Sequence, residues 1–141
     1  MNQSIYFHQE DTSFQLQNIK ALRLWIAESI SKENKHIGHL SFIFCSDQYL
    51  LNINKKHLNH DFFTDVISFD YTEDDQISGD IYISLDRVKE NAKEFGFSLK
   101  DELHRIIIHG LLHLLGYSDK TSGLKALMKD KEDFYLSLRA F

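Results

Sequence analysis

The chain has 141 residues, 43% of them hydrophobic and 26% charged, which predicts one globular domain over residues 1–141 and excludes a disordered chain. Its apolar runs are far shorter than the roughly 20 residues of a membrane span, and no basic segment followed by an apolar stretch opens the chain. Its one cysteine, Cys45, excludes an internal disulfide. We therefore expect a cytoplasmic protein without signal peptide or membrane association. The net charge of −5 is not typical of a general nucleic-acid binder, and the eight histidines direct attention to metal and acid–base chemistry.

The first half of the chain predicts two strands, each followed by a helix. Residues 4–9 alternate in polarity, as a half-buried strand does. Residues 16–31 place apolar side chains at helical spacing, which predicts an amphipathic helix. The apolar and aromatic residues 39–45 predict a second strand, and the Ser-Asp pair after it is a suitable N-cap for a short helix over residues 48–58.

The second half of the chain predicts two more strands and three helices. Residues 64–71 and 79–84 are rich in β-branched and aromatic residues, and the short acidic turn between them favours an antiparallel hairpin. Helices are predicted over residues 86–95, 98–115 and 122–138, and a glycine ends each of the first two. Because strands and helices do not alternate strictly, we expect an α+β fold with a small mixed sheet of about four strands covered by helices.

The segment from Arg105 to Asp119, R-I-I-I-H-G-L-L-H-L-L-G-Y-S-D, has the spacing of a metal site. His109 and His113 are four residues apart and therefore lie on one face of the predicted helix. Gly116 lets the chain leave the helix in a left-handed conformation, so Asp119 can turn back towards the same ion. Two histidines and one carboxylate with an open position form the ligand set of a catalytic zinc site. We therefore expect one Zn²⁺ per chain, held by the helix and the loop after it.

The same histidine pair has a simpler explanation as two core residues. Burying two imidazoles in a helix of Ile and Leu costs free energy unless they are hydrogen-bonded or coordinated, which favours the metal site. The offsets also match the metalloprotease signature H-E-x-x-H-x-x-G-x-x-H, but Gly110 stands where those enzymes have their general base. The pattern therefore points away from a peptidase and towards a phosphodiester, whose charge a metal ion can neutralise.

Four motifs resemble those of a known family. The segment H-G-L-L-H-L-L-G-Y followed by an acid resembles the signature H-G-x-L-H-L-x-G-Y-D-H of the YbeY family of metal-dependent endoribonucleases. T-D-V-I-S-F at 64–69, G-D-I-Y-I-S at 79–84, and Met128 with Glu132 resemble further family motifs in the same order, and the resemblance covers roughly residues 40–132. It implies a zinc-dependent, single-strand-specific endoribonuclease in 16S rRNA maturation and ribosome quality control, with rRNA and ribosomal small-subunit proteins as partners in the cytoplasm.

The chain departs from the family pattern at two positions. Asp119 stands where the usual third ligand is a histidine; a carboxylate is a competent zinc ligand, and the alternative is a site that no longer binds metal. Leu58 holds, by register, the position of a family arginine and cannot bind phosphate. Nearby basic side chains are candidates to replace it: Lys55, Lys56, His57 and His60.

The predicted site therefore has a metal-binding part and an RNA-binding part. Arg105 lies one helical turn before His109, where it could reach a phosphate or pair with Glu102 or Asp101. We expect Arg105, His109 and His113 to be catalytic and these four residues to bind RNA: Lys55, Lys56, Arg105 and Lys120. Two alternatives stay open, a ribosome assembly and RNA-binding factor with a structural zinc and, less favoured, a zinc peptidase.

Overall fold

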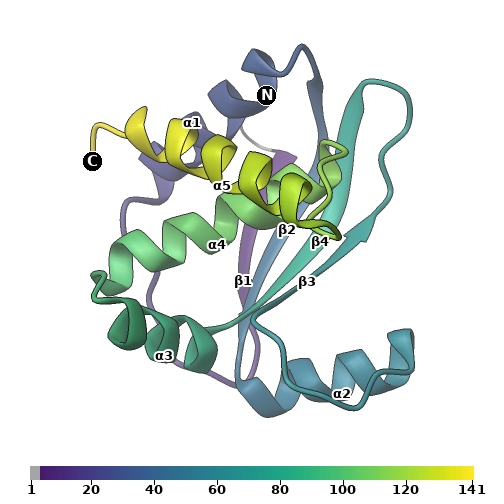
Figure 1. Ribbon diagram of the computed structural model, residues 1–141, viewed down its shortest axis with the longest axis vertical. Helices are drawn as coiled ribbons and strands as arrows, with labels where there is room; N and C mark the ends of the chain where they lie inside the picture. Colours follow the sequence, from purple (N-terminus) through teal and green to yellow (C-terminus); the bar gives the residue numbers. More distant parts are fainter. Residues whose placement is uncertain (1–3) are drawn as a thin grey trace.

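A computed structural model describes residues 4–141 and is shown in Figure 1. Its strands are β1 (Ile5–Gln9), β2 (His36–Cys45), β3 (Val66–Asp70) and β4 (Gln76–Ser84). Its helices are α1 (Ile19–Lys32), α2 (Asp47–Leu58), α3 (Leu85–Phe95), α4 (Leu99–Leu114) and α5 (Ser122–Ser137). Each strand and helix predicted from the sequence is present, with ends displaced by a few residues.

The strands form one mixed sheet in the order β1-β2-β4-β3. β1 and β4 both run parallel to β2, whereas β3 runs antiparallel to β4 and completes the predicted hairpin. β2 and β4 begin earlier than predicted because His36 and Ile37 pair with Gln76 and Ile77 at the start of the two strands. The predicted α+β fold with a small mixed sheet covered by helices is confirmed.

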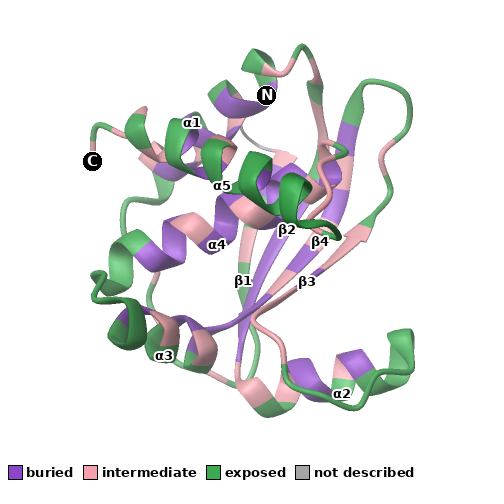
Figure 2. Ribbon diagram, in the orientation of Figure 1, coloured by how far each residue is buried: buried purple, intermediate pink, exposed green. Residues whose placement is uncertain are grey.

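Helices cover the two faces of the sheet unequally. Figure 1 shows α4 and α5 stacked over one face, with α1 behind them and α2 set apart at one end. The main core fills the space between the sheet and helices α1, α3, α4 and α5, and its members include Phe42, Ile81, Ile26 and Ile107. Beneath α2 lies a smaller cluster of Cys45, Leu50 and Ile67. Figure 2 shows the consequence for α4, which is buried along most of its length, while α5 exposes its outer side.

Two local features place helix α4 against the sheet. The Ser98 hydroxyl accepts a hydrogen bond from the Asp101 N–H at 3.0 Å and caps the first turn. Gly110 permits a close approach, since a Cβ at this position would lie 2.7 Å from Cγ2 of Ile81 on β4. The helix then ends before Gly116, whose φ of 101° lets the chain turn back over the last turn of α4. The loop that follows is thereby directed to the face that carries the predicted metal ligands.

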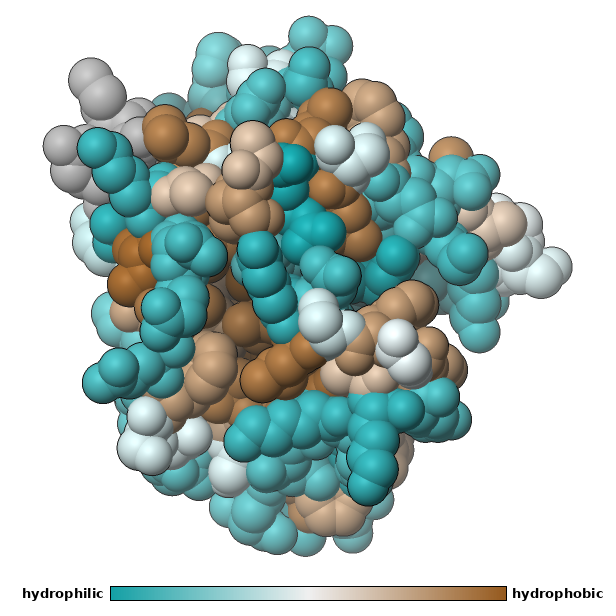
Figure 3. Space-filling model, turned by 90° about the vertical axis from the view of Figure 1, so that its left-hand side faces the viewer, coloured by the Kyte–Doolittle hydropathy of each residue, from teal (hydrophilic) through white to brown (hydrophobic). Residues whose placement is uncertain are grey.

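The molecular surface mixes polar and apolar side chains. Figure 3 shows hydrophobic atoms near the middle of one face, with hydrophilic atoms around them. Several aromatic rings are about half exposed, among them Phe62, Phe95 and Phe97. Single exposed apolar residues are normal on protein surfaces, so only a ring beside a functional group calls for an explanation. Among the described residues, no helix has the length and apolarity needed to cross a bilayer.

Candidate metal centre

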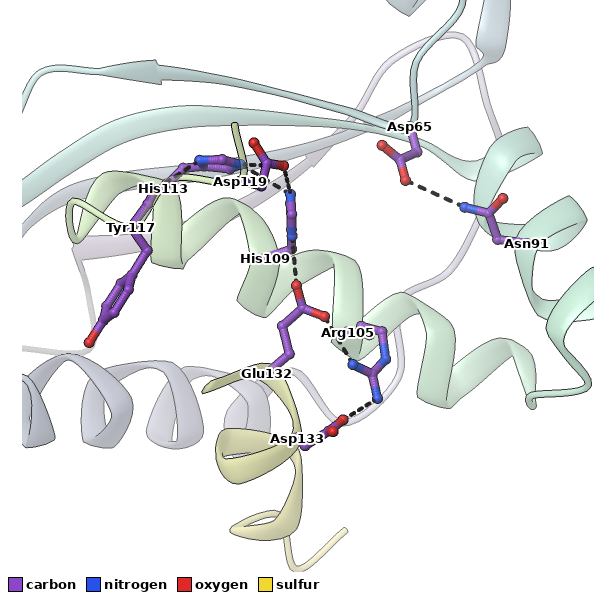
Figure 4. A network of polar contacts seen from close by, with 9 residues as sticks. All are labelled: Asp65, Asn91, Arg105, His109, His113, Tyr117, Asp119, Glu132 and Asp133. Atoms are coloured by element: carbon purple, nitrogen blue, oxygen red, sulfur yellow. Dashed lines mark hydrogen bonds and ion pairs between the residues drawn. The ribbon is translucent and has the colours of Figure 1, made fainter. Parts of the chain in front are cut away.

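The C-terminal half of α4 and the loop after it bring three ligand atoms together. Nε2 of His109 and Nε2 of His113 lie 3.0 Å apart, and Oδ2 of Asp119 lies 3.5 and 3.6 Å from them. All three side chains are partly exposed, and their ligand atoms lie within 4.8 Å of one another (Figure 4). The group can hold a metal ion, as the spacing of these residues predicts.

The second nitrogen of each imidazole contacts a hydrogen-bond acceptor. Nδ1 of His109 lies 2.7 Å from Oε2 of Glu132, and Nδ1 of His113 lies 3.2 Å from the carbonyl oxygen of Tyr117. A carboxylate and a carbonyl accept hydrogen bonds, so each Nδ1 donates and each Nε2 is left with a lone pair. Both lone pairs and the Asp119 carboxylate converge on one point, which fits a cation.

The surroundings move the pKa values of the two imidazoles in opposite directions. Burial disfavours the charged form of His109, but the hydrogen bond and charge of Glu132 outweigh it and raise its pKa. Burial and the neighbouring His109 lower the pKa of His113. Neutral imidazole, with its proton on Nδ1 and a lone pair on Nε2, is the form that binds metals.

Glu132 connects the histidines to α5 and to Arg105. Its side chain is only 9% exposed, and its Oε1 accepts a hydrogen bond from Arg105 at 2.9 Å while Oε2 contacts His109. The other end of the Arg105 guanidinium donates to Asp133 at 2.7 Å. Arg105 thus pairs with two carboxylates of α5, not with Glu102 or Asp101. A carboxylate that accepts a hydrogen bond from the non-ligating nitrogen of a metal-binding histidine fixes the tautomer and orientation of the ring.

A cleft of about 610 Å³ opens beside the ligand group, between the end of α2, β3 and the loop after α4. His109, His113 and Asp119 line it, together with Lys120 and Leu58. Leu58, the position that by register carries an arginine in the family, thus lies in the wall of this cleft. The ligand group is open to a substrate on this side.

The predicted RNA-binding residues lie in different places. Lys120 lines the cleft, whereas Lys55 and Lys56 lie on α2 outside its lining and Lys55 pairs with Asp61 at 3.4 Å. Arg105 lines a second, smaller cavity with Phe97 and Asp133. The structure thus brings one of the four to the metal ligands and leaves the other three away from the cleft wall.

Gly110 explains why the metalloprotease interpretation does not suit this site. The position faces Ile81 and Ser68 on the sheet, and α4 packs there without room for a Cβ. Any side chain at this position would collide with Ile81, so the packing of α4 on the sheet is incompatible with a glutamate base there.

Reasoning from the sequence does not reveal two acidic side chains in the hydrogen-bond network around the ligand group. For Glu132, the sequence shows a match to a family motif but no contact with His109. Glu33, at the end of α1, accepts a hydrogen bond from the Tyr117 hydroxyl at 2.7 Å and also contacts Tyr135 and Lys131. The only sequence signal for Glu33 would have been its acidity next to a helix end, which is common on surfaces.

The fold and the site together define a small α+β protein with a His-His-Asp group at an open cleft. Comparison with known proteins shows which family has this fold. The family model "Endoribonuclease YbeY" matches residues 4–139. A protein of Cytophaga hutchinsonii named endoribonuclease YbeY is 50% identical over 140 residues, covering 99% of this chain and 98% of that protein.

Two further proteins resemble this chain over most of its length. The endoribonuclease YbeY of Flavobacterium psychrophilum is 53% identical over 114 residues, which is 81% of each chain. The solution structure of a Thermotoga maritima protein superposes with a TM-score of 0.67 at 29% identity, covering 94% of this chain and 87% of that one. The chain belongs to the YbeY family of endoribonucleases, so the predicted family and the predicted enzyme class, a nuclease acting on RNA, are confirmed.

Proposed function

We propose that the chain is a zinc-dependent endoribonuclease that cleaves single-stranded RNA at the His109–His113–Asp119 group. The observation that carries the proposal is the convergence of two Nε2 lone pairs and one carboxylate oxygen at an open cleft. Imidazole and carboxylate ligands with one side left open are typical of catalytic zinc sites, whereas structural zinc sites are closed by four ligands. The described residues supply three ligands, which favours the enzyme over an assembly factor with a structural zinc.

When bound, the metal ion would supply a Lewis acid that neutralises charge on the scissile phosphate and activates the attacking oxygen. Residues of the chain position the ligands and the RNA. Glu132 and the Tyr117 carbonyl hold the Nδ1 protons of His109 and His113, so both rings keep their ligand atoms directed at one point. Lys120 places a positive charge at the cleft for the RNA backbone.

The remaining predicted residues have separate parts in the proposal. Arg105 acts in this arrangement as a positioning residue, because it holds Glu132 and Asp133. Direct contact of Arg105, Lys55 and Lys56 with RNA stays a prediction. From the family resemblance we also infer ribosomal RNA as the substrate, in 16S rRNA maturation and ribosome quality control. Small-subunit proteins of the ribosome would then be the partners, in the cytoplasm.

The test is cleavage of a single-stranded RNA and of casein by zinc-loaded protein, each with and without a chelator. We expect RNA cleavage that the chelator abolishes and added zinc restores, with casein intact. His113→Ala should lose the activity, while His36→Ala, an exposed histidine at the start of β2, should keep it. Degradation of casein alone, or chelator-resistant RNA cleavage, would contradict the proposal.

A further inference from the structure

The loop between α2 and β3 is held in place by one buried amide. Asn54 on α2 is only 1% exposed, and its Nδ2 donates to the carbonyl oxygen of Phe62 at 2.9 Å. Its backbone carbonyl accepts from the His60 N–H at 3.1 Å. Asn59 between them takes a left-handed conformation, with φ of 57°, that turns the chain sharply. The backbone that carries residues 60 and 62 is therefore fixed from both sides.

This fixed loop presents two stacked aromatic rings to the cleft. The rings of His60 and Phe62 have centroids 5.0 Å apart and planes inclined by 22°. Both residues are exposed, Phe62 to 54%, and both line the same cleft as the metal ligands. Exposure alone would not distinguish Phe62, since Phe95 is 58% exposed without lining this cleft. Among the described aromatic residues, only His60 and Phe62 combine ring stacking, a backbone fixed by hydrogen bonds and a position in the cleft of the ligand group.

We propose that His60 and Phe62 form a stacking platform for one nucleobase of single-stranded RNA, next to the phosphate that is cut. This inference rests on the proposed nuclease function. A flat aromatic pair offers its face to any unpaired base, and stacking of this kind is the usual way in which proteins hold single strands. Lys120 lies on the same cleft and attracts the backbone, while Leu58 beside the pair adds apolar surface. The platform would thus help to position the RNA in a cleft that has leucine, not arginine, at position 58.

The test couples a change in the protein with a change in the RNA. Phe62→Leu removes the flat ring but keeps apolar bulk, and Phe62→Tyr keeps the ring. Short single-stranded RNAs carry one abasic nucleotide at successive positions. Dissociation constants are measured by anisotropy immediately after rapid mixing with zinc-loaded protein, so that the readout does not depend on cleavage; KM and kcat are measured in parallel.

We expect Phe62→Leu to weaken binding and raise KM about tenfold, with kcat and zinc content unchanged, and Phe62→Tyr to behave as the wild type. One abasic position should weaken binding to the wild type about tenfold and have little further effect on Phe62→Leu. Phe95→Leu is the matched control and should bind every RNA as the wild type does. Unchanged affinity in Phe62→Leu, or equal effects of each abasic position on both proteins, would overturn the platform. RNA binding with this coupling but without cleavage would leave the platform standing and refute the nuclease.

Discussion

Glu132 is the residue on which the orientation of His109 depends most. It lies on α5, is nearly buried, and accepts from both His109 and Arg105. One carboxyl oxygen of Glu132 contacts His109 and the other contacts Arg105. The contact with Arg105 keeps the carboxylate from turning away from the His109 ring. Loss of its charge should therefore weaken the metal site without removing a ligand.

Glu132→Gln should lower zinc affinity about 10- to 100-fold, the range typical of groups that orient a metal-binding histidine. The measurement is competition for zinc with a chromophoric chelator. Asp133→Asn is the matched control, since Asp133 contacts the same arginine but not His109. Equal affinity in the wild type and Glu132→Gln would show that the carboxylate does not support the site.

His104 makes the stability of the protein depend on pH. It is buried between the rings of Trp25 and Phe141, and its Nδ1 lies 2.8 Å from the Arg139 guanidinium. Burial, together with the positive charges of Arg139 and Lys100, lowers its pKa to about 4. The folded protein thus keeps this ring neutral where the unfolded chain, with a pKa of about 6.5, already takes up a proton.

Stability should therefore fall as the pH drops from about 6.5 towards 4. Linkage predicts a loss of about 2 kcal/mol from this residue between pH 7.5 and 5. Urea unfolding of the wild type and of His104→Gln at both pH values measures it, because glutamine keeps a hydrogen-bond acceptor and does not titrate. If both proteins lose the same amount, His104 is not the cause.

Helix α4 is the element that joins the core to the site. One of its faces packs on β4 through Gly110, and the neighbouring face carries the two histidines. Its distance from the sheet therefore sets the position of the ligands relative to the cleft wall formed by β3. A side chain at Gly110 would push the helix away from Ile81.

Gly110→Ala should destabilise the protein by about 1–3 kcal/mol, as overpacking in a core does, although alanine is the better helix former. Gly123→Ala is the control on α5, where an added Cβ meets nothing within 4 Å, and should be neutral or slightly stabilising. Chemical denaturation of both variants provides the comparison. A Gly110→Ala protein as stable as the wild type would mean that the helix need not lie so close to β4.

Local signals predicted the elements well and their assembly less completely. The Ser98 cap, the turn at Gly116 and the four-residue histidine spacing are all encoded within a few residues of sequence, so α4 and its ligands could be predicted. The partner of His109 could not, because Glu132 reaches it only when α5 folds back onto α4. The partners of Arg105 could not be predicted for the same reason, since they come from α5 and not from its own helix.

The whole molecule has the form of a sheet that supports its site at one edge. The antiparallel strand β3 lies at the end of the order β1-β2-β4-β3, and the cleft lies where α2, β3 and the loop after α4 meet. The strand order could not be read from local patterns, since parallel pairs join segments far apart in the chain. The net charge of −5 is compatible with the proposed RNA cleavage, because Lys120 lines the cleft and a bound metal ion would add further positive charge there.

The proposed reaction requires a metal ion held by the ligands on α4 and the loop after it. The most direct measurement is the zinc content of purified protein by elemental analysis, in the wild type, Asp119→Ala and the exposed control Asp130→Ala. We predict about one equivalent of zinc in the wild type and the control, and much less in Asp119→Ala. No zinc in any of the three after supplementation, or undiminished zinc in Asp119→Ala, would contradict the assignment of the site.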